Sequence, residues 1–217
     1  MVTKPPTHDS PDLVILISGN GSNLQAINDA IEGGALNARI TAVISNEPDA
    51  YGLERARNSG IPAHVICHRS YGSRQEFDLE LARVVSRLQP DLVILAGFMR
   101  ILGPGFISRF PNRILNIHPS LLPRYKGTDT HRRVLEAGES EHGASVHLVT
   151  EALDSGPVIQ QVRVQVLAGD DPETLARRVI EQEHRLYPAA IAKYWSETVR
   201  VTGDNIPANP SQESTSK

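Results

Sequence analysis

Short apolar segments recur along this chain, and their spacing constrains its fold more than any other feature. Continuous apolar runs of this length are typical of strands that are buried on both faces of a parallel sheet. The expected strands are Leu13–Ile17, Ile40–Ser45, Ala63–Cys67, Asp91–Ala96, Ile114–His118, Ala144–Val149 and Val158–Val166. The last of them alternates between apolar and polar residues, and we expect it to be partly exposed.

Helix-like segments separate these strands. They are expected at Leu24–Ile31, Leu53–Asn58, from the capping box Ser73-Arg74-Gln75-Glu76 to Pro90, at Pro104–Phe110, at Thr130–Ala137 and from Pro172 to about Tyr187. A last short strand is expected at Thr198–Val201. The alternation predicts an α/β fold that is Rossmann-like, with a mostly parallel twisted sheet flanked by helices.

Composition divides the 217 residues into one folded domain and two tails. Residues 1–11 contain prolines and charges without an apolar core, and we expect a flexible N-terminal tail. Residues 207–217 are rich in Pro, Ser, Gln and Lys and are predicted to be disordered. Residues 12–206 remain as one folded domain. The whole chain is 40% hydrophobic, enough for a sizeable core.

Charge and cysteine usage disfavour several classes of protein. The net charge is −3, and the pairs Arg132-Arg133 and Arg177-Arg178 lie in helix-like segments, which favours solvated faces over a nucleic-acid surface. The apolar runs are too short to cross a membrane. One cysteine, Cys67, cannot form an internal disulfide, so we expect a cytoplasmic protein. His64, Cys67 and His68 do not converge with a fourth ligand on an alternating strand, and no metal is expected.

A glycine-rich turn follows the first expected strand. Ser18-Gly19-Asn20-Gly21-Ser22-Asn23 leads directly into a helix, whose first N–H groups lack partners and favour an anion. A dinucleotide fingerprint would need a third glycine where Leu24 stands. The turn therefore favours a single phosphate monoester, held by backbone amides together with Ser22 and Asn23. An ordinary tight turn is the alternative.

The segment Ile114–His118 carries the strongest chemical signal. Asn116 and His118 are two residues apart on a strand, so their side chains point to the same face. Pro119 favours extended geometry at His118 and places the ring at the strand's carboxyl end. An amide donor beside a titratable ring can stabilise an oxyanion and supply a proton. In a parallel sheet this end meets the glycine turn and the Gly97–Leu102 loop at one edge.

Four segments taken together resemble the phosphoribosylglycinamide formyltransferase family. They are Ser18-Gly19-Asn20-Gly21-Ser22-Asn23-Leu24, Ala96-Gly97-Phe98-Met99-Arg100-Ile101-Leu102, Leu115-Asn116-Ile117-His118-Pro119-Ser120-Leu121-Leu122-Pro123 and Asp154-Ser155-Gly156-Pro157-Val158. They occur in the family's order and span residues 12 to about 195.

The resemblance implies formyl transfer from 10-formyltetrahydrofolate to glycinamide ribonucleotide, a step of purine (IMP) biosynthesis. It implies that Asn116 and His118 stabilise a tetrahedral intermediate and that Asp154 assists proton transfer. The implied ribonucleotide-binding residues are Gly21, Ser22, Asn23, Leu24 and Glu183. The implied folate-binding residues are Arg74, Met99, Arg100, Ile101, Leu102, Asn116, Thr150 and Asp154. The sequence leaves both a monomer and a homodimer open.

The chain departs from the family pattern in one loop, and three alternatives stay open. Many members have aromatic-Pro-Gly where this chain has Tyr125-Lys126-Gly127, and histidine where it has Asp129. The sequence of Arg124–Gly127 slightly favours methionyl-tRNA formyltransferase. That enzyme lacks the glycine-turn motif and adds a tRNA-binding domain. Formyltetrahydrofolate deformylase usually adds an N-terminal regulatory domain. The third alternative is a non-catalytic nucleotide- or folate-binding protein on the same fold.

Overall fold

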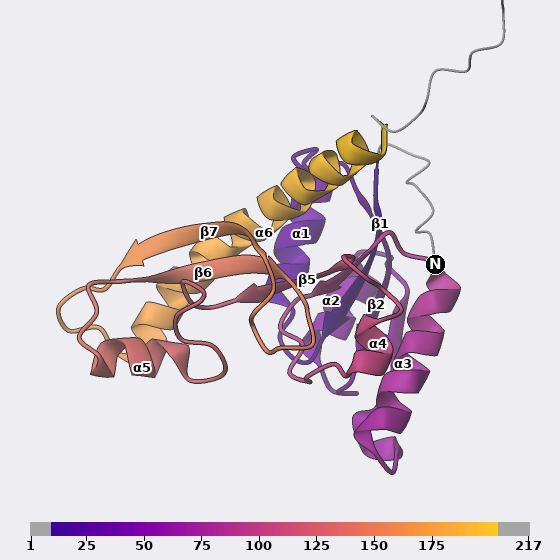
Figure 1. The fold of residues 1–217 in the computed structure, drawn as a ribbon, viewed down its shortest axis with the longest axis horizontal. Coiled ribbons are helices and arrows are strands. Elements are labelled where there is room, and N and C mark those ends of the chain that lie inside the picture. The colour runs from indigo at the N-terminus through magenta and orange to yellow at the C-terminus, as the bar shows by residue number, and fades with distance from the viewer. Residues whose placement is uncertain (1–9, 204–217) are drawn as a thin grey trace, which may run out of the picture.

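A computed structural model describes residues 10–203, which form a twisted seven-stranded sheet with helices on both faces (Figure 1). The strands are β1 (Asp12–Ile17), β2 (Arg39–Ser45), β3 (Ala63–Val65), β4 (Leu92–Leu95), β5 (Ile114–His118), β6 (Glu141–Leu148) and β7 (Val158–Gln165). The helices are α1 (Ser22–Glu32), α2 (Tyr51–Asn58), α3 (Arg74–Leu88), α4 (Pro104–Ile107), α5 (Thr130–Glu136) and α6 (Pro172–Gly203), with a 3₁₀ turn at His68–Ser70.

The strand order is β3-β2-β1-β4-β5-β6-β7. The first five strands in this order are parallel, whereas the β5–β6 and β6–β7 pairs are antiparallel. The chain moves outward from β1 to β3, then returns to β4 on the other side of β1. The carboxyl ends of β1 and β4 therefore form the switch point of the sheet, where open α/β sheets bind ligands. The predicted fold class is confirmed.

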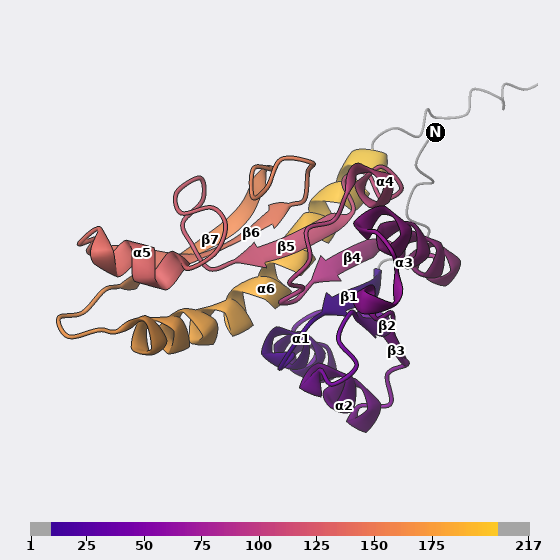
Figure 2. The ribbon, with the colours of Figure 1, turned by 90° about the horizontal axis from the view of Figure 1, so that it is seen from below.

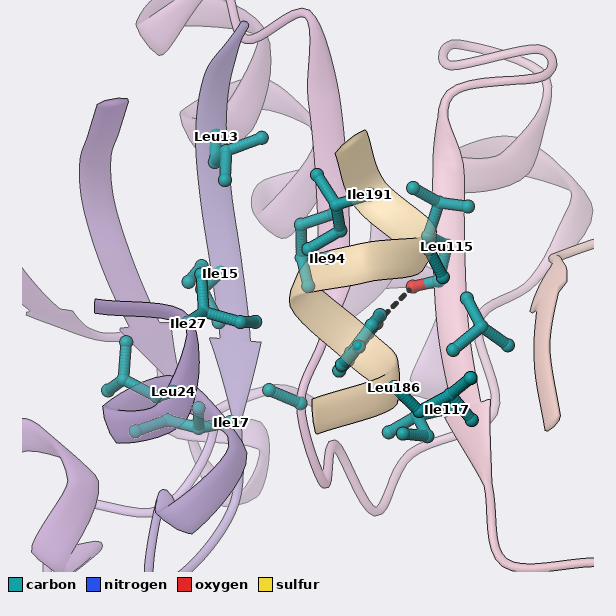
Figure 3. Packing of buried hydrophobic residues seen from close by; sticks show 14 of the residues in the cluster. Leu13, Ile15, Ile17, Leu24, Ile27, Ile94, Leu115, Ile117, Leu186 and Ile191 are labelled. Atoms are coloured by element: carbon teal, nitrogen blue, oxygen red, sulfur yellow. Dashed lines mark hydrogen bonds between the residues drawn. The ribbon is translucent and has the colours of Figure 1, made fainter. Parts of the chain in front are cut away.

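Alternation along β1 divides the core into two layers. Leu13, Ile15 and Ile17 pack with α1, α2 and α6, whereas Val14 and Leu16 pack with α3 and α4. Figure 2 shows these two sets of helices on opposite faces of the sheet. In Figure 3, the labelled side chains of β1, β4 and β5 meet α1 and α6 in one continuous apolar layer.

Two sequence signals set the ends of helices that frame the site. Ser73 Oγ accepts a hydrogen bond from the Glu76 amide at 3.2 Å, while the Glu76 carboxylate accepts one from the Gly72 amide at 3.0 Å. These two bonds form the predicted capping box, except that the Glu76 carboxylate bonds the amide of Gly72, one residue before the N-cap Ser73. At the start of α6, Asp171 Oδ1 accepts from the Thr174 amide at 2.7 Å.

Several predicted elements differ from the structure in extent or type. The helix predicted at Pro104–Phe110, for example, ends at Ile107. The predicted strand Ala63–Cys67 ends at Val65, because the chain turns at once into the 3₁₀ segment. The predicted end of the last helix near Tyr187 and the predicted strand Thr198–Val201 are both wrong, since α6 continues through Pro188 to Gly203. Ala190, Ile191 and Trp195 are buried beyond the proline, so packing against the sheet outweighs the lost helical hydrogen bond.

The predicted tails lie largely outside the described residues, as do residues 204–206 of the predicted domain. Pro11, assigned to the N-terminal tail, is buried, and its carbonyl accepts from the Arg39 amide at 2.9 Å. In the part of the chain that the structure describes, no helix is both long and apolar enough to span a membrane.

Candidate active site

The loops after β1 and β4 are joined at the switch point. The Ser18 amide donates to the Gly97 carbonyl at 3.2 Å, and Ser18 Oγ accepts from the Met99 amide at 2.7 Å. Ser18 Oγ also donates to Asn46 Oδ1 at 2.5 Å, which ties in the end of β2. The glycine turn and the predicted folate loop therefore form one hydrogen-bonded unit.

Gly21 caps the N-terminus of α1 in a left-handed conformation with φ of 74°, and no side chain caps this helix. A Cβ atom on Gly21 would lie 2.7 Å from Gly52 Cα. Glycine is thus required both by φ and by the close approach of α2. The backbone N–H groups in the first turn of α1 therefore have no side-chain cap, and such groups are able to bind an anion.

Asn23 and Glu183, 160 residues apart, meet beside this turn. Asn23 Nδ2 donates to Glu183 Oε2 at 2.8 Å, and both side chains are buried. Burial raises the pKa of Glu183, while the hydrogen bond from Asn23 opposes this shift. Within the described residues, Asn23 Oδ1 is buried without a hydrogen-bond partner. Leu24 packs in the core, so only its backbone is offered to a ligand.

The antiparallel pairing of β5 with β6 brings two polar pairs together. Asn116 lies opposite His147, and His118 lies opposite Ser145. The Asn116 Nδ2 to His147 Nε2 distance is 3.1 Å. Directly opposed residues share a face of the sheet, so all four side chains lie on the side away from α6.

His118 lies between a carbonyl and a carboxylate. Its Nε2 is 3.0 Å from the Tyr125 carbonyl, and its Nδ1 is 3.5 Å from Asp154 Oδ2. A carbonyl oxygen can only accept, so Nε2 carries a hydrogen and Nδ1 faces the carboxylate. Asp154 also approaches His147, with 3.7 Å between Oδ1 and Nε2. One carboxylate therefore faces both histidines.

Two loops fix Asp154 over the strand pair. Asp154 Oδ2 accepts from the Gly127 amide at 2.9 Å, and Lys126 Nζ donates to Ser155 Oγ at 2.6 Å. Tyr125 and Asp154, which contact the ring of His118, are both left-handed, with φ of 53° and 46°. Such conformations cost on the order of 1–3 kcal/mol each and concentrate at functional sites.

The predicted folate residues are only partly brought together. Met99 and Ile101 are 78% and 56% exposed on the loop after β4, which suits them to contact an apolar ring. Leu102 is buried in the α3–α4 core, so its side chain does not line the loop's outer surface. Thr150 Oγ1 donates to the Ala152 carbonyl at 3.2 Å within its own loop.

Arg74 adjoins the folate loop through Asp78. Arg74 Nε is 3.6 Å from Asp78 Oδ2, and the same oxygen accepts from the Gly103 amide at 2.8 Å. Burial raises the pKa of Asp78, while the Gly103 amide, Arg74 and Arg100 oppose this shift. Among the described residues, no group of three or more His, Cys, Asp or Glu side chains could hold a metal ion.

His147 and the Tyr125 carbonyl are site groups that the sequence reasoning missed. A signal existed for the histidine, because Ser145 and His147 alternate with apolar residues in the predicted strand Ala144–Val149. The same two-residue spacing singled out Asn116 and His118.

Comparison with known proteins shows the family of the chain. The profile of the formyl transferase family matches residues 12–191. The chain belongs to the formyl transferase family. It is 52% identical over 181 residues to phosphoribosylglycinamide formyltransferase of Escherichia coli (strain K12), covering 83% of this chain and 85% of that protein.

Two further relatives extend the comparison. The chain is 46% identical to a segment of the trifunctional purine biosynthetic protein adenosine-3 of Drosophila pseudoobscura pseudoobscura, covering 87% of this chain and 14% of that protein. The crystal structure of glycinamide ribonucleotide transformylase 1 from Symbiobacterium toebii superposes with a TM-score of 0.85 at 46% identity. This match covers 87% of this chain and 89% of the solved chain.

The departures from the family pattern have structural roles here. Lys126 joins the two loops over His118, as described above. Asp129 is the N-cap of α5 and forms an ion pair with Arg132 at 2.9 Å. Nearby, His131 Nδ1 is 3.0 Å from His142 Nε2. Burial lowers the pKa of His142 to about 4.

Proposed function

We propose that this chain transfers the formyl group of 10-formyltetrahydrofolate to the amine of glycinamide ribonucleotide, in de novo purine biosynthesis. One observation carries the proposal. Asn116 and His118 share a face at the carboxyl end of β5, with Asp154 Oδ2 3.5 Å from His118 Nδ1. The names of the Escherichia coli and Symbiobacterium toebii relatives support the choice of substrate.

The reaction places a negative charge where these residues can meet it. The substrate amine attacks the formyl carbon, a C–N bond forms, and the carbonyl oxygen becomes an oxyanion. The Asn116 amide and a protonated His118 stabilise this tetrahedral intermediate. The amine then loses a proton, N10 of the folate gains one, and the bond between N10 and the formyl carbon breaks. Asp154 assists these proton transfers through His118.

The two substrates have separate binding regions in this proposal. The ribonucleotide phosphate binds at the N-terminus of α1, through the backbone of residues 21–24 and the side chains of Ser22 and Asn23. Glu183 accepts a hydrogen bond from a ribonucleotide hydroxyl. The folate packs on Met99 and Ile101, whose exposed apolar side chains fit an aromatic ring, with Arg74 and Arg100 as its cationic contacts. Thr150 and Asp154 complete the opposite side, while Leu102 supports the loop from the core.

The test compares acceptors for the formyl group. Purified protein with 10-formyltetrahydrofolate should release tetrahydrofolate only when glycinamide ribonucleotide is added. Transfer to methionyl-tRNA, or formate release with water alone, would instead identify one of the two related activities. Binding of both substrates without turnover would indicate the non-catalytic alternative.

The ribonucleotide site has its own matched pair of variants. Glu183→Ala should raise KM for the ribonucleotide and leave KM for the folate unchanged. Glu181→Ala, an exposed residue on the same helix, is the control and should change neither constant. Equal effects on both substrates would contradict the assignment of Glu183.

We also propose a cytoplasmic location. Cys67, the one cysteine in the sequence, is a free thiol, which suits a reducing compartment.

A further inference from the structure

We propose that His147 is a positioning residue for formyl transfer: its neutral ring, with hydrogen on Nδ1, accepts a hydrogen bond from Asn116 and fixes the orientation of that carboxamide. The inference rests on the proposed role of Asn116, and His147 acts only through it. Asn116 and His147 lie directly opposite each other in the β5–β6 ladder.

The hydrogen-bond partners of His147 determine where its proton lies. His147 Nδ1 is 2.9 Å from the Leu148 carbonyl oxygen, which can only accept. Nδ1 therefore carries a hydrogen, and a neutral ring has its lone pair on Nε2. That lone pair faces Asn116 Nδ2 at 3.1 Å. A doubly protonated ring would instead place two donors against each other.

The surroundings of the ring favour its neutral form. His147 is 2% exposed, and burial is the largest cause that lowers its pKa. His118 and Lys126 lower the pKa further, whereas the bond to the Leu148 carbonyl and the charge of Asp154 raise it. The downward shift prevails.

The orientation of Asn116 matters because a carboxamide has a donor end and an acceptor end. Rotation by a half turn would replace Nδ2 with Oδ1 and turn a lone pair toward a developing oxyanion. With one Nδ2 hydrogen bound to His147, the second hydrogen on the same nitrogen remains available to the substrate. A hydrogen on His147 Nε2 would favour the flipped carboxamide and would also attract Asp154 Oδ1, 3.7 Å away, from its place near His118.

Two substitutions separate this role from simple packing. His147→Gln can place a carbonyl oxygen near the position of Nε2, whereas His147→Asn reaches only to the position of Nδ1. We expect His147→Asn to lower kcat by about 10-fold or more, short of the 10²–10³-fold typical of losing the donor itself. His147→Gln should recover most of the rate, and both KM values should stay near those of the parent chain.

A double-mutant cycle tests whether His147 acts through Asn116. In an Asn116→Ala background, His147→Asn should cause little further loss of kcat, because the carboxamide that it orients is absent. Additive losses would overturn the proposal. A large loss in Asn116→Ala with a native rate in His147→Asn would overturn it too, while leaving the proposed function intact. A native rate in Asn116→Ala would contradict the proposed role of Asn116 itself.

A measurement on the unmodified protein remains decisive if the variants unfold. Nitrogen-15 NMR of the histidine rings distinguishes the two neutral tautomers and the doubly protonated form. The His147 ring signals are assigned through bonds from the backbone resonances of the same residue, so no variant is needed. We expect a neutral ring with hydrogen on Nδ1 near pH 7. Hydrogen on Nε2, alone or together with Nδ1, would overturn the proposal.

Discussion

The two faces of the β5–β6 strand pair are both largely buried, yet one face is apolar and the other is polar. The face toward α6 carries Leu115, Ile117, Ala144 and Val146. The other face carries Asn116, His118, Ser145 and His147. The apolar face gains stability from area removed from water. The polar face must satisfy each buried donor and acceptor with a partner.

This difference locates the chemistry. The apolar face packs against α6 (Figure 3), and Val134 of α5 belongs to the same buried cluster. The polar face is covered by loops. The Tyr125 carbonyl and the Asp154 carboxylate from those loops contact His118, and the Gly127 amide donates to Asp154. Substitutions on the two faces should therefore fail in different ways, one in stability and the other in turnover.

Leu115→Ala should have the largest effect, a loss of unfolding free energy, because it disrupts the packing of the apolar face. Leu115 is fully buried, and truncation of such a leucine costs about 2–5 kcal/mol of unfolding free energy. Chemical denaturation measures the loss, and kcat per folded molecule should stay near that of the parent. Leu79→Ala, on the exposed side of α3, is the control and should leave stability nearly unchanged. A large loss of kcat per folded molecule of Leu115→Ala would contradict the distinction between the two faces.

Asn116→Ala and His118→Ala should break the polar face. Each removes a group that meets the oxyanion, so kcat should fall about 10²–10³-fold while the melting temperature changes little. Steady-state assays and thermal melts measure the two effects. His64→Ala, an exposed histidine on β3, should retain full activity. Near-native turnover in either folded variant would remove the proposed mechanism.

The layers of the fold could be predicted from the sequence because they depend on local patterns. Leu13–Ile17 and Asp91–Ala96 are apolar runs whose alternate residues pack on opposite layers, and this needs no knowledge of distant segments. The prediction failed at Pro188, where a local rule for ending helices met a stronger non-local effect, the burial of Ile191 and Trp195.

The proposed site could be predicted only in part for the same reason. Asn116 and His118 share one strand, so their common face follows from spacing alone. His147 comes to Asn116 through the antiparallel register of β5 with β6, which the sequence pattern does not fix. Glu183 reaches Asn23 across 160 residues, and only a family resemblance singled it out in the sequence.

Ser145→Ala should sharpen the comparison, because this residue is on the polar face but has a supporting role. Ser145 Oγ accepts from the Leu122 amide at 3.0 Å and donates to the Ser120 carbonyl at 2.5 Å. Its loss leaves a buried amide without its partner, which costs about 1–3 kcal/mol. Denaturation should show this loss with a smaller change in kcat than in His118→Ala. Ser86→Ala, on the exposed side of α3, is the control.

Glu183→Gln should have the smallest effect, and it tests a buried acid on α6. Burial raises the pKa of Glu183 in the folded chain above its ordinary value of 4.5. Below that pH the Glu183 carboxyl is protonated in both the folded and the unfolded chain, so glutamate and glutamine should give similar stability. As pH rises, the unfolded chain ionises first, so stability is lost until the folded pKa is passed. Glutamine keeps an oxygen that can accept from Asn23 but cannot ionise.

Glu183→Gln should therefore match the parent at acid pH and become more stable than it toward neutral pH. The size of the gain follows from how far burial raises the pKa of Glu183. Urea denaturation at a series of pH values measures the difference, and exposed Glu181→Gln should stay close to the parent throughout. Equal stability of Glu183→Gln and the parent at every pH would mean that this carboxylate ionises without penalty. The α6 side would then tolerate charge as the polar face does, and the contrast between the two sides would not extend beyond the strands themselves.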